Sequence, residues 1–214
     1  MTDTSKLDDA YDLNSDADHR ALYRDWARTY DTEFAATRDF RLPALVARAF
    51  LDIVPHPSPV LDIGAGTGLL AAGIATGAWV DAPVIDALDL SKEMLAIAAE
   101  KRVYRDLHAV ALADHRDRVG ADYAAVVSSG AFTHGHLGPD ALAAAFALLR
   151  PGGHYVLSIN AAHYHAADFA AGFARLDTWV TAPTLAEVAI YGTAIGDDHD
   201  HDTAYIAVGK RHPE

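Results

Sequence analysis

The sequence predicts an α/β fold, a doubly wound seven-stranded sheet that is mostly parallel, with one antiparallel strand near the C-terminus. Three observations predict it. Short apolar runs alternate with helix-periodic segments from residue 58 onward, as in consecutive βαβ units. A glycine-rich turn joins the first apolar run to the helix after it. The last two apolar runs have no helix between them, so they can form a hairpin.

The chain has 214 residues, of which 51% are hydrophobic, and this suits one domain with a sizeable core. We expect a polar N-terminal arm over residues 1–18, mobile at its start. A single domain over 19–214 follows, with a helical lid and first helix at 19–54 and the sheet core at 58–210. No apolar run approaches the roughly 20 residues that span a bilayer, and the N-terminus lacks the features of a secretory signal. These features predict a cytoplasmic location.

The elements follow in order from the aromatic stripe of residues 19–40. Tyr23, Trp26, Tyr30 and Phe34 recur at spacings of three and four, which is typical of one helix face. Pro43 then begins a second helix over 43–54. The expected strands are 60–64, 84–90, 107–112, 122–130, 152–160, 180–192 and 203–210. The helices expected among them are 67–77, 91–102 with Ser91 as N-cap, 138–150 and 164–176.

The composition excludes several classes of function. The formal net charge is −13 and there is no dense Lys/Arg cluster, so nucleic acids and anionic membranes are not expected partners. The absence of cysteine excludes disulfides and cysteine-based zinc sites. The run DDHDHD at 197–202 carries metal-ligand residue types, but it joins two strands and shows no supporting set of ligands. We interpret it as a solvated turn and predict no metal.

The stretch VLDIGAGTGLLA at 60–71 has the form of a nucleotide-binding turn, because its glycines let the backbone and the helix N-terminus approach a ligand. A packed turn without a ligand is the alternative. Gly64, Gly66 and Gly68 do not have the spacing of the dinucleotide fingerprint. Asp62, two residues before the first glycine, would repel a pyrophosphate and attract an ammonium group.

A second acid, Asp89, ends the next expected strand, 25 residues after Gly64. A carboxylate there can accept both ribose hydroxyls, and no Arg stands beside it to bind a 2′-phosphate. The alternative is a residue that stabilises the start of the following helix. With the glycine turn, these features favour a phosphate-free nucleoside with a cationic tail, a description that S-adenosylmethionine fits.

Three motifs in this order, VLDIGAGTG, ALDLSKEML and LLRPGGHYVLSIN, resemble those of the class I S-adenosylmethionine-dependent methyltransferases, which have a Rossmann-like sheet. The likeness spans about Tyr23 to Lys210. The segments YRDWARTYD, KRVYRDL and SSGAFTHGHLGP further resemble the type 11/12 group, including the methyltransferases named for the Williams–Beuren region. That narrower likeness names no substrate.

The resemblance implies a set of cofactor-binding residues: the glycine loop for the methionine part, the acid after the second strand for ribose, apolar neighbours for adenine, and an N-terminal lid. The aromatic stripe is alternatively ordinary core packing. Ala111 stands where the family often has an acid, so the adenine contact falls to the backbone around Ala111 and Leu112, or to Asp114. The implied residues are Tyr23, Trp26, Tyr30, Asp62, Gly64, Ala65, Gly66, Thr67, Gly68, Asp89, Leu90, Met94, Ala111, Leu112, Ser128, Ser129 and Gly130.

The resemblance also implies the reaction, in which a small-molecule acceptor receives the methyl group of S-adenosylmethionine by in-line displacement. His134 and His136, after the fourth strand, are the candidate general bases, or else polar loop residues. A base is needed only where the accepting atom carries a proton. The alternatives are a non-catalytic protein that binds S-adenosylmethionine or S-adenosylhomocysteine (SAH), and a less favoured NAD-dependent oxidoreductase. We expect a monomer or homodimer.

Overall fold

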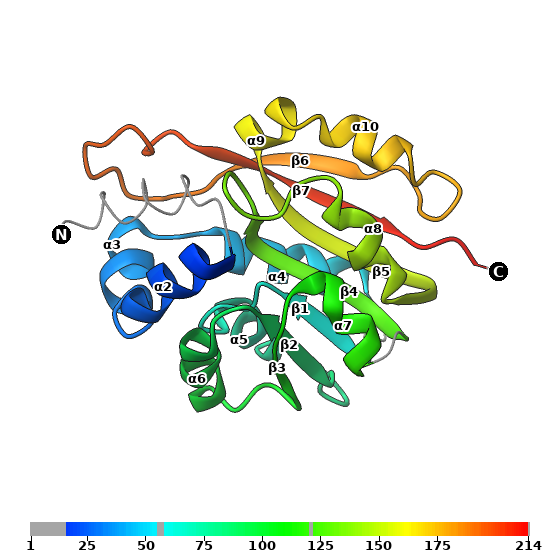
Figure 1. The fold of residues 1–214 in the computed structure, drawn as a ribbon, viewed down its shortest axis with the longest axis horizontal. Helices are drawn as coiled ribbons and strands as arrows, with labels where there is room; N and C mark the ends of the chain where they lie inside the picture. Colours follow the sequence, from blue (N-terminus) through cyan, green and yellow to red (C-terminus); the bar gives the residue numbers. More distant parts are fainter. Residues whose placement is uncertain (1–15, 55–57, 120–121, 214) are drawn as a thin grey trace.

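A computed structural model describes residues 16–54, 58–119 and 122–213 (Figure 1). Its seven-stranded sheet has the order β3-β2-β1-β4-β5-β7-β6. The strands are β1 (Val60–Ile63), β2 (Ile85–Asp89), β3 (Leu107–Ala109), β4 (Tyr123–Phe132), β5 (Leu149–Asn160), β6 (Thr184–Ala189) and β7 (Thr203–Lys210). β7 runs antiparallel to both of its neighbours, and the pairs from β3 to β5 are parallel. The predicted fold class is confirmed.

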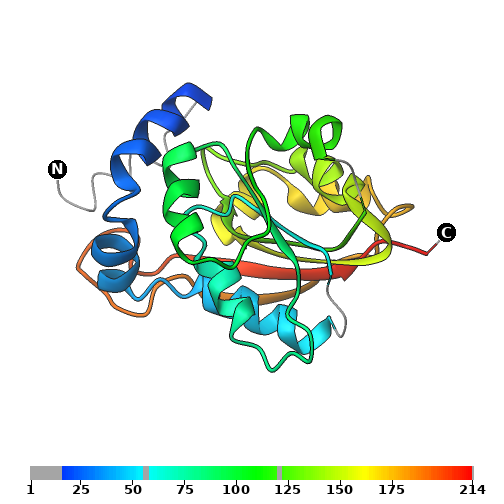
Figure 2. The ribbon, with the colours of Figure 1, turned by 90° about the horizontal axis from the view of Figure 1, so that it is seen from below.

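Helices cover both faces of the sheet (Figure 2). On one face lie α4 (Leu42–Ile53) and α5 (Leu69–Ala75), with α6 (Lys92–Glu100) beside α5. On the other lie α7 (Leu112–Val119), α8 (Ala141–Ala147), α9 (Ala161–Ala166) and α10 (Phe169–Ala174). All four residues of β1 are buried, as expected for a parallel strand between two helical layers.

The N-terminal segment departs from the predicted single helix. It forms α2 (Asp16–Trp26), a turn, the π-helix η1 (Tyr30–Ala35) and the short α3 (Ala36–Arg38). The break allows the Trp26 ring to contact both Tyr30 and Phe34, at centroid distances of 5.1 and 4.9 Å. The prediction of one continuous helix was wrong because this packing outweighs local helix periodicity. The predicted arm over 1–18 lies outside the described residues, except where α2 begins.

Two other elements differ from prediction. The expected helix over 164–176 is divided into α9 and α10 at Asp168, which has a left-handed backbone (φ 54°). Its carboxylate caps α10 by accepting a hydrogen bond from the Ala171 amide at 3.2 Å. The helix α7 was not predicted because its sequence, LADHRDRV, is largely polar. The helix begins at Leu112, inside the expected strand 107–112, and β3 is only three residues long.

A buried ion pair ties the N-terminal helices to the loop between β6 and β7. Arg38 is fully buried and donates to Asp197 through both of its terminal nitrogens. Its guanidinium lies 5.0 Å from the centroid of the Tyr191 ring and 5.9 Å from that of Phe34. The run 197–202 is therefore not a fully solvated turn, because its first residue docks this loop against the lid (Figure 1).

We predict that Asp197→Ala lowers the free energy of unfolding by about 3 kcal/mol, because it leaves the Arg38 charge buried without its carboxylate. Urea denaturation measures this value. Asp198→Ala, at an exposed neighbouring position, is the control and should change stability by less than about 0.5 kcal/mol. Equal values for the two variants would contradict the assigned ion pair.

Candidate functional site

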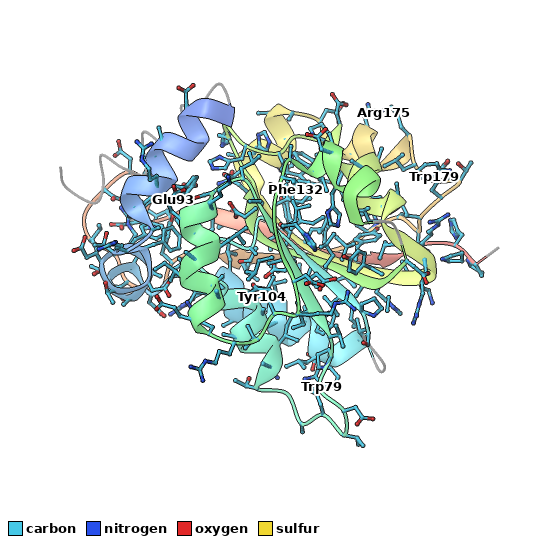
Figure 3. All side chains as sticks on the ribbon, turned by 60° about the horizontal axis from the view of Figure 1, so that its bottom comes forward. Trp79, Glu93, Tyr104, Phe132, Arg175 and Trp179 are labelled. Atoms are coloured by element: carbon cyan, nitrogen blue, oxygen red, sulfur yellow. The ribbon has the colours of Figure 1, made fainter. Side chains whose placement is uncertain are left out.

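A cavity of about 510 Å³ lies where β1, β2, β4 and β5 end, beneath the N-terminal helices. Ligands of open parallel sheets bind at this edge. All the predicted site residues line the cavity except Gly68, Ser128 and His134. Figure 3 shows Tyr104 and Phe132 toward the centre of the molecule, and Trp179 and Arg175 at its edge.

The glycine loop between β1 and α5 packs closely against its neighbours. The amides of Gly64 and Ala65 donate to the Leu88 carbonyl at 2.8 and 3.1 Å, which joins the loop to the end of β2. Gly64 has a φ of 66°, and a Cβ there would lie 2.4 Å from the Ala131 Cβ. Only glycine fits both constraints. The loop is thus held against both β2 and the segment after β4.

Asp62 is a buried carboxylate that is only partly satisfied. It is 1% exposed, and its Oδ2 accepts a 2.7 Å hydrogen bond from the Tyr104 hydroxyl. Its Oδ1 is buried and has no hydrogen-bond partner among the described residues. Burial raises the pKa of Asp62 to about 7; the Tyr104 hydrogen bond opposes this shift and the charge of Asp89 adds to it. The Oδ1 of Asp62 lacks a hydrogen-bond donor, and a ligand with an ammonium group would supply one.

Asp89 is fixed in place by backbone amides. Its Oδ2 accepts from Gly66 N and its Oδ1 from Ser91 N, both at 2.8 Å. Ser91 is the N-cap of α6 as predicted, because its hydroxyl accepts from the Met94 amide at 3.2 Å. Asp89 therefore supports the helix start and also lines the cavity, so the two interpretations are compatible.

A hydrogen-bonded cluster joins the lid to the glycine loop. Asp31 of η1 accepts from the Thr67 hydroxyl at 2.5 Å and from Lys101 Nζ at 2.7 Å. Lys101 also donates to the Thr67 carbonyl at 2.7 Å. Asp31, Lys101 and Tyr104 were not among the predicted site residues. The signal for them was their place in the segments YRDWARTYD and KRVYRDL.

The two candidate histidines have different surroundings. His136 lines the cavity, its Nδ1 lies 2.9 Å from the His134 carbonyl, and its Nε2 lies 2.8 Å from the Tyr23 hydroxyl. A carbonyl can only accept, so Nδ1 carries a proton, and in the neutral form of the ring Nε2 can then accept from the Tyr23 hydroxyl. The His134 ring instead packs against His163, at a centroid distance of 4.9 Å. His136 is therefore the better placed base.

Ser128 does not line the cavity, because it is buried in β4 and donates to the Ile63 carbonyl at 2.8 Å. Part of the lining was not among the predicted site residues. Phe34 continues the aromatic stripe and Asn160 ends the motif LLRPGGHYVLSIN, whereas Phe40 and Tyr191 lie in connecting segments that no motif marks. These residues widen the cavity beyond what the glycine loop and Asp89 enclose.

The charge of the cavity is negative. Its charged lining residues are Asp62, Asp89 and Asp140, and no Lys or Arg of the described chain lines it. Over the same described ranges, no cluster of three or more His, Cys, Asp or Glu side chains could hold a metal ion. None of the described helices has the length and apolarity needed to cross a membrane.

Residues 60–153 match the family model described as a methyltransferase domain. A search of the curated proteins finds no significant match. Among solved structures, the plantazolicin methyltransferase BpumL in complex with a pentazolic desmethylPZN analog and SAH has a TM-score of 0.61 at 12% identity, and the alignment covers 97% of each chain. The match over residues 60–153 and the sheet order support the predicted resemblance to class I methyltransferases and support S-adenosylmethionine as the cofactor.

Other neighbours share the fold at similarly low identity. A protein from Methanococcus maripaludis, assigned as an S-adenosyl-L-methionine-dependent methyltransferase, has a TM-score of 0.58 at 14% identity over 91% of this chain and 94% of its own. The ribosomal protein L11 methylase from Lactobacillus delbrueckii subsp. bulgaricus has a TM-score of 0.54 at 17% identity over 78% of each chain. Such distant likenesses concern the fold alone.

We predict that Asp62→Asn stabilises the ligand-free protein more at high pH than at low pH. An unfolded aspartate titrates near 3.8, whereas folded Asp62 titrates near 7. Ionisation of Asp62 therefore destabilises the folded state. This destabilisation grows as the pH rises from the pKa of the unfolded aspartate to about 7, and it is constant above pH 7. The variant should gain about 2.5 kcal/mol relative to the wild type between about pH 5 and pH 8, measured by urea denaturation.

Asp81→Asn, at an exposed position, is the matched control and should show no such trend. A stability difference between Asp62→Asn and wild type that stays constant across this pH range would contradict the raised pKa of Asp62.

Proposed function

We propose that this protein is an enzyme that transfers the methyl group of S-adenosylmethionine to a small-molecule acceptor. The observation that carries the proposal is the buried Oδ1 of Asp62, which has no partner within the described structure and lies in a cavity whose described charged lining residues are all acidic. Such a site suits a nucleoside that carries an ammonium group and no phosphate. The matched methyltransferase domain covers both Asp62 and Asp89.

The residues of the cavity fit the parts of this cofactor. Asp62 would take the ammonium group, and Asp89, already oriented by two backbone amides, would accept the ribose hydroxyls. Leu90 and Met94 would flank the adenine on the side of α6. The backbone around Ala111, the residue before α7, would meet the adenine edge.

When bound, S-adenosylmethionine supplies a methyl group already activated by its sulfonium, so the protein must orient the acceptor and exclude water. The lid serves the second task, since Asp31 fixes it to the glycine loop at Thr67. For an acceptor that carries a proton, His136 would receive it through the Tyr23 hydroxyl, because His136 Nε2 accepts from that hydroxyl. The cytoplasmic location, the oligomeric state and the domain limits stay predictions.

Isothermal titration tests the cofactor assignment. We expect S-adenosylmethionine and SAH to bind, and we expect SAH to bind about eightfold more weakly at pH 6 than at pH 7.5, because protons compete for Asp62 at its raised pKa.

Adenosine, which lacks the ammonium group, is the matched control ligand and should bind equally at both pH values. Asp62→Asn should remove the pH dependence for SAH. Failure of SAH to bind at about 1 mM, or tighter binding of NAD, would overturn the assignment.

A further inference from the structure

The cavity spans the point between β1 and β4 where the strand order of the sheet reverses. β1, β2 and β3 lie on one side of the molecule, and β4, β5, β7 and β6 follow on the other. The glycine loop and Asp89 belong to the first group. Beyond the end of β1, the cavity is lined by groups other than the glycine loop, Asp62 and Asp89, and we call this part of it the acceptor compartment. It comprises Phe34, Phe40, Thr133, Ser129, Asn160 and Tyr191.

Aromatic rings from the lid and from the segment after β6 form one wall of this compartment. The Phe40 ring packs 5.7 Å from Phe34 and 6.0 Å from Tyr191, centroid to centroid. A Cβ on Gly130, at the end of β4, would lie 3.5 Å from the Phe40 ring tip, so this ring lies over the strand end. Walls of aromatic rings favour an aromatic guest, which can pack against them edge-to-face or offset-stacked.

The charges around the compartment disfavour a charged guest. Asp62 and Asp89 would repel an anion, and among the described residues no Lys or Arg lines the cavity to compensate. A cationic guest gains little from this wall, because the Arg38 guanidinium already lies over the rings of Tyr191 and Phe34 and the cofactor's own ammonium group would occupy Asp62. An uncharged acceptor meets neither penalty.

Hydroxyl groups in the compartment favour a guest with a polar atom of its own. Thr133 is 8% exposed, and its Oγ1 is buried without a hydrogen-bond partner in the described structure. The Ser129 Oγ is likewise buried without a hydrogen-bond partner in the described structure. Close by in the lining, the Tyr23 hydroxyl lies 2.8 Å from His136 Nε2, and with Nδ1 protonated a neutral His136 can take up a proton through this contact.

We propose that the acceptor is an uncharged aromatic compound that bears a hydroxyl group, as a phenol does; this rests on the proposed methyltransferase function. The acceptor oxygen forms its bond to the methyl carbon while the methyl–sulfur bond breaks to leave a neutral thioether. The hydroxyl proton passes to the Tyr23 oxygen as the Tyr23 proton passes to His136 Nε2, which leaves an imidazolium.

Binding to the SAH-loaded protein tests this proposal without turnover. Four probes of one size serve: naphthol, naphthoate, aminomethylnaphthalene and the saturated decahydronaphthol. We expect naphthol to bind at least about tenfold more tightly than each of the other three, measured by calorimetry. Equal or tighter binding of any of the three, or no binding of naphthol at about 1 mM, would overturn the proposal.

Variants connect that preference to the compartment. Phe40→Leu should weaken naphthol binding about fivefold while the affinity for SAH stays unchanged, because only the aromatic wall is altered. Trp179→Leu, an equivalent change at the exposed edge of the molecule, should alter neither affinity (Figure 3). Unchanged naphthol binding in Phe40→Leu would contradict the location. Failure of the wild-type protein to bind SAH would instead overturn the proposed function.

Discussion

The buried carboxylate of Asp62 is the group on which the site depends. A carboxylate at 1% exposure is unfavourable unless hydrogen bonds compensate it, and here Tyr104 satisfies one oxygen only. The sheet places this group beside Asp89 at the ends of β1 and β2, so two acids share one edge of the cavity. The protein thereby keeps a local negative charge that is costly without a ligand and favourable with a cationic one.

The remaining architecture keeps this region closed and ordered. The glycine loop packs on β2 and against Ala131, and Asp31 and Lys101 bind the lid to the loop at Thr67. On the far side, Arg38 anchors the loop between β6 and β7 to the same lid. The N-terminal helices thus contact both the glycine-loop part of the cavity and the acceptor compartment. In our account, the lid excludes water from the cofactor and also supplies the aromatic wall for the acceptor.

The sequence predicted those features that neighbouring residues encode. Short motifs whose geometry is local contain β1, the glycine turn and the cap of α6 at Ser91. Tyr104 could not be derived in this way, because it meets Asp62 across 42 positions of sequence, and Lys101 meets Asp31 across 70. The break after Trp26 was also missed, because it depends on tertiary ring packing rather than on helix periodicity.

The most direct test of the central claim counts the protons released when SAH binds near pH 7. Calorimetry in buffers of different ionisation enthalpy gives that number. Free Asp62, with a pKa of about 7, is half protonated there, and a bound ammonium group would ionise it fully, so we predict release of about half a proton per SAH. Adenosine should release none, nor should SAH with Asp62→Asn. Binding of SAH to the wild type without proton release would contradict the account.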